Sequence, residues 1–321
     1  MAIIARFGKP DLFITFTRNA NWTEIASILL PHQFPSDRPD IVARVFQLKL
    51  NAFLYDILKK GIFEQVKAHM LVVEFQKRGL PHCHLLVCLV DQGKFRTPEE
   101  VDKIIWAHIP DPSLEQLYDV VTRFNLHGRC GHLNTDAPCM DISIGKCSKR
   151  FPKPYCDRTR MDVDGFPEYA RPSQGFTYTT SSGEVVGNEW VVPYNWYLSS
   201  EYEAHTNVEL CSTISAIKYL NKYVYKGPDR ARLIMRSNPD VDSIKYDEIR
   251  SYLDTRYSCP PQAAWNIFRF ALHDRSHSVV RLPVHLPGQQ EIFFQEGHEV
   301  DAVNAAAERN TQHSYYHLTS Y

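Results

Sequence analysis

Two histidines separated by one residue, His82 and His84, lie in a run of residues that is typical of a β-strand. Because side chains alternate across a strand, both imidazoles should face the same side of a sheet, where their ring nitrogens can share a metal ion. Glu74 precedes them in a second strand-like run, and a hairpin that turns at Gly79 would bring its carboxylate beside the pair. Gln76 would lie on the same face as Glu74 and is an alternative third ligand.

Two imidazoles and one carboxylate would form an open site with mixed nitrogen and oxygen ligands. Such a site suits Mg²⁺ or Mn²⁺ acting on a phosphodiester better than it suits a closed structural zinc. The alternative is a pair of buried histidines in a sheet that hold no metal.

Tyr219 and Tyr223 lie in the segment 212–227, whose apolar residues recur at helical spacing. Residues four apart are neighbours on a helix surface, so the two hydroxyls should share one face with Lys226, away from the apolar stripe. A phenolate in this positive environment could attack a phosphate. The alternative is that the rings pack against the protein and their hydroxyls contact water.

A third group of candidate residues lies in a segment with little regular periodicity, and its members are soft metal ligands: His127, Cys130, Cys139 and Cys147. A structural zinc would replace the hydrophobic core that such a segment lacks. Reduced free cysteines are the alternative, and His132 and Cys156 are further candidate ligands.

The segment 146–160 combines basic and aromatic side chains. Six of its residues are Lys or Arg and one is acidic, and Phe151 and Tyr155 lie between them. Such a pattern can follow a single nucleic-acid strand through phosphate contacts and base stacking. A solvated basic loop is the alternative.

Hydrophobic periodicity predicts the elements that must position these residues. Strands are expected at 12–17 and 278–284, and an antiparallel hairpin is expected at 63–75 and 82–90. Helices are expected at 22–30, 40–60, 98–107, 113–124, 212–226, 245–253, 260–272 and 300–309. The segment 127–197 lacks a helical period, so we expect an irregular or β-rich insertion.

The composition limits the class of protein. The chain of 321 residues is 44% hydrophobic and 23% charged, which excludes a mainly disordered protein. Because 36 Lys and Arg balance 37 Asp and Glu, any affinity for nucleic acid must be local. No run reaches the roughly 18 to 20 apolar residues of a membrane span, and the N-terminus lacks a signal-peptide pattern. We therefore expect an intracellular protein without a membrane partner, and nothing in the sequence matches a phosphate-binding loop for nucleotide hydrolysis.

The order of these motifs resembles that of the HUH endonucleases, which initiate rolling-circle replication. A strand that ends in Thr15-Phe16-Thr17 comes first, then the His-hydrophobe-His strand, then the helix with tyrosines and lysines. Within that superfamily the sequence resembles the N-terminal portion of the Helitron transposase, because similar phrases occur at 7–17, 74–84, 127–131, 138–140, 146–153, 191–195 and 218–227.

The resemblance implies an α+β, HUH-endonuclease-like fold, in which a mostly antiparallel sheet is flanked by helices and a Cys-rich module is inserted. We expect an HUH core formed by 1–126 and 201–321, the second part with a C-terminal helical extension, and the Cys-rich insertion at 127–200. The resemblance also implies that His82 and His84 hold the divalent ion, that Glu74 is the acidic ligand, and that Tyr219 and Tyr223 are the paired nucleophiles.

The implied activity is that of a single-stranded DNA endonuclease and strand transferase that acts on transposon ends in the nucleus. A tyrosine would attack a DNA phosphate, which leaves a 5′-phosphotyrosine and a free 3′-hydroxyl. The cofactor would be Mg²⁺ or Mn²⁺, together with a structural Zn²⁺ in the inserted module.

Two departures from the family pattern qualify this expectation. Ala20 stands where the family usually has proline, and no helicase motor follows in this chain. We therefore expect a truncated or domesticated copy, or a fragment, that depends on a helicase domain or protein in trans. The alternatives are a catalytically inactive remnant that binds single-stranded DNA or a protein, and a zinc-stabilised RNA-binding module.

Overall fold

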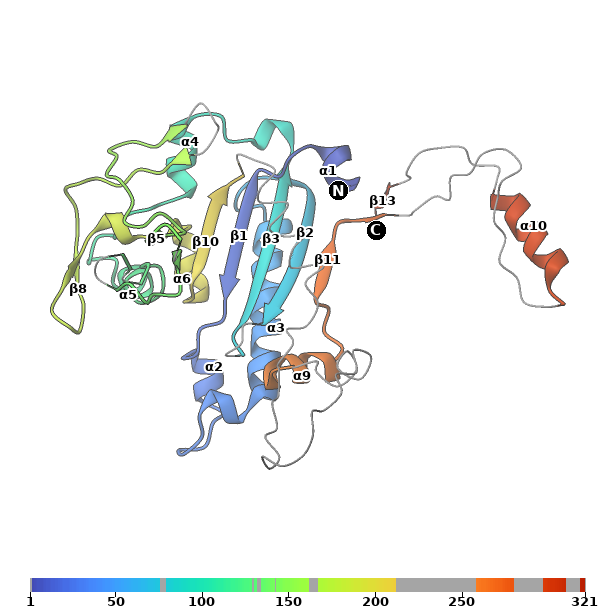
Figure 1. Ribbon diagram of the computed structural model, residues 1–321, viewed down its shortest axis with the longest axis horizontal. Coiled ribbons are helices and arrows are strands. Elements are labelled where there is room, and N and C mark those ends of the chain that lie inside the picture. Colours follow the sequence, from blue (N-terminus) through green and yellow to red (C-terminus); the bar gives the residue numbers. More distant parts are fainter. Residues whose placement is uncertain are drawn as a thin grey trace.

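The centre of the structure is an antiparallel sheet of five strands in the order β10-β1-β3-β2-β11 (Figure 1). These strands are β1 (Leu12–Thr17), β2 (Val66–Phe75), β3 (Pro81–Leu89), β10 (Thr206–Leu210) and β11 (His273–Arg275). The computed structural model describes residues 2–75, 79–128, 130–131, 134–141, 143–161, 167–211, 258–279, 297–309 and 318–320. The predicted α+β class with an antiparallel sheet is confirmed.

One face of the sheet packs against the long helix α3 (Pro39–Leu58), which Figure 1 shows running behind the strands. Pro39 suits the first turn of this helix because its missing N–H would have no partner there. Phe16 of β1 stacks on Phe46 and Phe53 of α3 at ring-centroid distances of 5.6 and 4.6 Å. This aromatic contact joins helix and sheet in the main core.

The other helices of the described residues are shorter. They are α1 (Ala2–Phe7), α2 (Thr23–Ala26), α4 (Pro98–Ile104), α5 (Glu115–Phe124), α6 (Trp196–Tyr202), α9 (Pro260–Ile267) and α10 (Glu299–Arg309). Three short 3₁₀ helices lie at Pro35–Asp37, Asp91–Gly93 and Asn188–Trp190. None of the helices in the described part of the chain is long and apolar enough to span a membrane.

The segment between α5 and α6 forms short two-residue strands, as its composition predicts. These are β4 (Met140–Asp141), β5 (Lys146–Cys147), β6 (Arg160–Met161), β7 (Pro167–Glu168), β8 (Tyr178–Thr179) and β9 (Val185–Val186). They pair as three separate hairpins, β4-β5, β6-β7 and β8-β9, and Figure 1 shows β5 near the edge strand β10 and β8 farther from it. We call residues 127–160 the cysteine module. Near the C-terminus β12 (His277–Val279) pairs with β13 (Leu318–Ser320).

Most of the elements predicted from periodicity are present, including the strand at 12–17, the long helix and the hairpin. Several predictions differ. The helix expected at 22–30 is only Thr23–Ala26, because Ile28 and Leu30 are exposed and no buried apolar face extends it. The helix expected at 260–272 ends at Ile267, where Arg269 adopts a positive φ of 55°, and the next residues form β11.

A further difference is that α1, α6 and β10 were not expected as separate elements. The predicted helices at 212–226 and 245–253 lie outside the described residues, and of the strand predicted at 278–284 only the part up to Val279 is described. The boundaries proposed for the inserted segment, 127 and 200, stay predictions.

Candidate functional site

The paired histidines lie in the middle of the sheet on the face opposite α3. The side chains of their strand β3 alternate between the two faces of the sheet. Cys83 and Leu85 therefore pack in the core against α3, and the two imidazoles point to the other side. His84 is buried, and His82 lies two residues nearer the end of the strand. Both rings are therefore available to one site on this second face.

Two threonines of the neighbouring strand β1 hold the rings in place. Nδ1 of His84 lies 3.1 Å from Oγ1 of Thr15, and Nδ1 of His82 lies 2.8 Å from Oγ1 of Thr17. These contacts follow from the antiparallel register, which places each threonine directly opposite its histidine. In the tautomer in which Nδ1–H donates to the threonine oxygen, Nε2 of each ring is the nitrogen that can bind a metal.

The carboxylate of Glu74 reaches this site from the other neighbouring strand. Glu74 of β2 stands opposite His82 in the register, and its Oε2 lies 3.5 Å from Nε2 of His84. Nε2 of His82 is buried and has no hydrogen-bond partner among the described residues. Two imidazoles and a carboxylate on one face are residue types that suit a divalent cation with nitrogen and oxygen ligands. Among the described residues, however, these three do not form a group whose ligand atoms lie close enough together to hold an ion.

The electrostatic environment keeps His82 neutral. Burial is the main cause, and the neighbouring His84 and His205 add to it, so that the pKa of His82 is lowered to about 3. A metal-binding imidazole must be neutral, so this environment prepares the ring for ligation.

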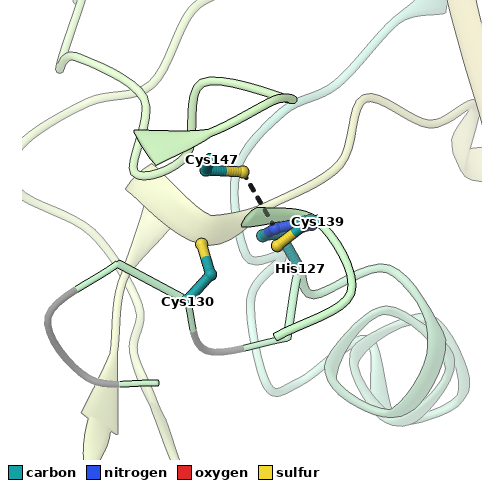
Figure 2. Close-up of side chains that lie close together, drawn as sticks. All are labelled: His127, Cys130, Cys139 and Cys147. Atoms are coloured by element: carbon teal, nitrogen blue, oxygen red, sulfur yellow. Dashed lines mark hydrogen bonds between the residues drawn. The ribbon is translucent and has the colours of Figure 1, made fainter. Parts of the chain in front are cut away.

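The cysteine module contains a more compact set of metal ligands. Among the described residues, one group of three or more His, Cys, Asp or Glu side chains brings its ligand atoms within 4.8 Å of one another, and it consists of His127, Cys130, Cys139 and Cys147 (Figure 2). Nε2 of His127 lies 3.5 Å from Sγ of Cys147. The cluster could hold a metal ion.

Short-range structure brings the ligands of the cysteine module together. In the β4-β5 hairpin Met140 stands opposite Cys147, which places Cys139 next to Cys147. The backbone N–H of His127 donates to the carbonyl of Trp190 (2.8 Å), and its ring stacks on Phe151 at 4.2 Å. The orientation of the imidazole is therefore fixed by contacts outside the ligand set.

The three thiols differ in acidity. Burial, with the neighbouring thiols of Cys147 and Cys139, raises the pKa of Cys130 to about 12, and burial also raises the pKa of Cys139. Burial acts in the same direction on Cys147, but the backbone N–H groups of Phe151 and Lys149 donate to its sulfur and lower its pKa below the ordinary value. These amides stabilise a thiolate, which is the form that binds metal.

Cys156, a further candidate in the sequence, is not part of this cluster. Its backbone instead pairs with Arg171, through N–H to carbonyl bonds of 2.9 and 2.6 Å in the two directions. His132 lies outside the described residues.

The comparison with protein families addresses the first of these two sites. Residues 1–87 match the family model described as "Helitron helicase-like domain at N-terminus". The predicted Helitron resemblance is therefore confirmed for this segment, which includes Glu74, His82 and His84. The cysteine module lies beyond it. A comparison with curated proteins finds no match.

The remaining predicted site residues are not described. Tyr219, Tyr223 and Lys226 lie in the segment 212–257, and Gln76 lies in the segment 76–78, both outside the described residues. Their roles stay predictions.

The structure adds residues to the histidine site that the sequence analysis did not single out. Besides Thr15 and Thr17, Asn207 of the edge strand β10 lies on the same face, opposite Thr15 in the register. His205 immediately precedes β10 and lies next to Thr17, because the backbone N–H of Thr17 donates to the carbonyl of His205 (3.0 Å). The alternation of polar and apolar residues in Thr206–Leu210 is the signal in the sequence for this strand. Its pairing with β1 is not visible in the sequence, because the two strands lie about 190 residues apart.

Proposed function

We propose that this chain is a metal-dependent endonuclease and strand transferase for single-stranded DNA, of the Helitron type and with an HUH-like fold. One observation supports this most strongly. Two histidines on one sheet face, each held at Nδ1 by a threonine and accompanied by Glu74, lie within the segment that matches the Helitron model. The proposed substrate is DNA at transposon ends, in the nucleus.

A divalent ion bound by His82, His84 and Glu74, either Mg²⁺ or Mn²⁺, would polarise the phosphodiester and offset the charge that develops on its oxygens. The threonines hold the Nδ1 atom of each ring, which leaves each Nε2 as the nitrogen that would bind the ion.

The proposed nucleophile is the hydroxyl of Tyr219 or Tyr223. Its oxygen forms a bond to phosphorus while the bond from phosphorus to the 3′-oxygen breaks, the phenol loses its proton, and the 3′-oxygen gains one. The products are a 5′-phosphotyrosine and a 3′-hydroxyl. Lys226 would stabilise the phenolate. Because the phosphodiester is exchanged for another ester, rejoining needs no nucleotide hydrolysis, and two tyrosines could act in turn.

This reaction takes a single strand as substrate. A duplex end must therefore be opened before cleavage, and we propose that a helicase domain or protein in trans supplies this step.

The proposal predicts a covalent protein–DNA adduct. The purified chain is incubated with a single-stranded oligonucleotide labelled at its 3′ end and Mn²⁺ or Mg²⁺, and an adduct that resists SDS is expected. The double substitution Tyr219→Phe and Tyr223→Phe should abolish the adduct, because it removes both hydroxyls and keeps both rings. The control is Tyr118→Phe, whose hydroxyl only donates to the carbonyl of Thr177 (3.1 Å).

An adduct formed by the double variant would place the nucleophile elsewhere. If the unmodified chain binds the oligonucleotide but forms no adduct with either divalent ion, the nuclease proposal is wrong and the chain is an inactive DNA-binding remnant.

We also propose that the cysteine module holds a structural zinc. One nitrogen and three sulfur ligands form a closed tetrahedral set, in which ligand atoms about 2.3 Å from the ion lie roughly 3.8 Å apart. The observed ligand atoms, all within 4.8 Å of one another, need only a small contraction. This zinc would be structural because all four positions are taken by the protein.

A further inference from the structure

A cluster of positive side chains lies on the cysteine module. Arg150 and Lys153 belong to the basic segment 146–160, whose formal charge is +5 from six basic residues and one acidic residue, whereas the whole chain carries −1. The backbone N–H of Lys153 donates to the carbonyl of Glu189 (2.9 Å), and the guanidinium of Arg171 donates to that of Val191 (2.9 Å), so both residues contact one short stretch of chain. Burial and then Arg171 lower the pKa of Lys153, and Arg150 contributes in the same direction. Glu209 is the one carboxylate that opposes this effect on Lys153.

Arg171 forms the base of this cluster. It is 4% exposed, its guanidinium donates to the carbonyls of Val191 (2.9 Å) and Tyr169 (3.4 Å), and its Nε has no hydrogen-bond partner among the described residues. No carboxylate in the described part of the chain is within salt-bridge distance of it. Its hydrogen-bond partners are carbonyl oxygens, and Glu209 is the carboxylate that attracts it from farther away. A buried cation without a directly bound carboxylate leaves a positive potential for an anion at the adjoining surface.

An exposed aromatic ring accompanies the cations. Tyr155 is 51% exposed, and its hydroxyl donates to Oε2 of Glu189 at 2.6 Å. This bond is the main reason that the pKa of Tyr155 is raised to about 12, so the hydroxyl stays protonated and the ring is held in place. Lys153 also lies over the ring of Phe151, with Nζ 5.1 Å from its centroid. A fixed, half-exposed aromatic ring in a basic segment is a surface on which a nucleic-acid base can stack.

The cluster lies next to the sheet face that carries the histidines. The hydroxyl of Tyr169, two residues before Arg171, accepts the backbone N–H of Leu210 in β10 (2.8 Å). Glu209 lies on the same face of β10 as Asn207, two residues away, and Asn207 stands opposite Thr15, the partner of His84. Figure 1 shows β5 of the cysteine module beside β10. A single nucleic-acid strand that runs from the histidines across β10 would reach the cysteine module.

We propose that Arg150, Lys153 and Tyr155, which we call the basic surface, bind the single-stranded DNA that extends from the histidine site across β10. This inference rests on the proposed function for the identity of its ligand. Phosphates contact Arg150 and Lys153, supported by the charge of Arg171, and a base stacks on Tyr155. Because these contacts do not read base edges, the surface binds strands of different sequence with similar affinity.

The test is fluorescence anisotropy with the full chain and labelled single-stranded oligonucleotides of two unrelated sequences, over a range of salt concentrations and without divalent ions. Lys153→Gln and Arg150→Gln are each expected to weaken binding to both sequences and to reduce the slope of log affinity against log salt by about 0.7, the loss of roughly one phosphate contact. The matched control is Lys59→Gln, an exposed cation at the end of α3, behind the opposite face of the sheet.

The aromatic contact is tested separately. Tyr155→Leu is expected to lower the affinity roughly tenfold with little change in the salt slope, and Tyr155→Phe should retain most of the affinity because it keeps the ring. Thermal unfolding of each variant establishes that it is folded.

The outcomes distinguish this inference from the proposed function. If the unmodified chain binds DNA but Lys153→Gln, Arg150→Gln and Tyr155→Leu bind as Lys59→Gln does, the basic surface is wrong and the nuclease proposal stands. If the variants weaken binding and no covalent adduct forms in the assay with Mn²⁺, the surface stands and the nuclease proposal fails. Absence of any DNA binding overturns both proposals, and the basic surface would then be a binding site for a protein partner.

Discussion

At the scale of single residues, the histidine site depends on side chains that do not touch the proposed metal. Thr15 and Thr17 bind the Nδ1 atoms of His84 and His82, and through them fix the direction of both Nε2 atoms. Residues that orient a ligand in this way commonly affect metal affinity almost as much as the ligand itself.

We therefore expect Thr17→Val to lower the affinity for Mn²⁺ by about 10- to 100-fold while the chain remains folded, since valine has nearly the same volume as threonine but no hydroxyl. Isothermal titration of Mn²⁺ into the purified protein measures the change. Thr179→Val, at an exposed strand position, serves as the control. Equal affinity of all three proteins would show that the threonine does not position His82.

The sequence predicted the histidine pair but not its threonine partners. Alternation within one strand is a local property, so the common face of His82 and His84 follows from their spacing alone. The contacts of Thr15 and Thr17 depend on the register between β1 and β3, because each threonine lies 65 or 69 positions from its histidine in the sequence. Periodicity carries no information about such a register.

At the scale of secondary-structure elements, the cysteine module is held by short hairpins instead of an apolar core. The strands β4 and β5 have two residues each, and the small buried cluster around them includes three of the proposed ligands, Cys130, Cys139 and Cys147. Elements this short gain little from backbone pairing, so the proposed zinc should supply most of the stability of the module.

Removal of the metal is accordingly expected to unfold the module and leave the sheet intact. Cys139→Ser should lose about one zinc per chain and become sensitive to limited proteolysis within 127–160, while the circular dichroism of the sheet and helices changes little. Metal analysis and mass spectrometry of the fragments provide the measurement.

Cys156→Ser is the matched control, because Cys156 lies in the same segment but outside the ligand cluster. It should keep its zinc. Zinc contents that are equal in Cys139→Ser and the unmodified chain, or zero in both, would contradict the proposed structural site.

Long and strongly periodic elements were predictable, whereas short ones were not. The apolar pattern of α3 and the hairpin β2-β3 gave these elements nearly at their observed bounds. The edge strands β10 and β11 have five and three residues, and β11 is exposed and polar, so neither has a distinctive pattern of its own. Tertiary pairing decides their conformation.

At the scale of the whole molecule, an aromatic cluster around Phe16 lies in the core that helix α3 and the sheet share. Phe16 is fully buried and packs on Phe46, Phe53 and the edge of Tyr202, at centroid distances of 5.6, 4.6 and 5.7 Å. It lies between Thr15 and Thr17 in β1, so a change in the packing of Phe16 would also displace the partners of the histidines.

Phe16→Ala is expected to lower the free energy of unfolding by about 3 to 5 kcal/mol, through lost burial and the cavity that remains. Phe34→Ala, at a residue that is 71% exposed, should change it by less than about 0.5 kcal/mol. Urea unfolding monitored by circular dichroism compares the two. A small effect of Phe16→Ala would mean that this contact does not join the two layers of the core.

The position of β1 between β3 and β10 has a consequence for how the chain is made. Its pairing with β3 is complete once residue 89 has emerged from the ribosome, but its other edge pairs with β10, from Leu12 opposite Leu210 to Phe16 opposite Thr206. At roughly 5 to 20 residues per second, β10 follows β1 by about 10 to 40 s. During this interval an apolar strand edge of the nascent chain stays open to other chains, and β10 closes it when it arrives.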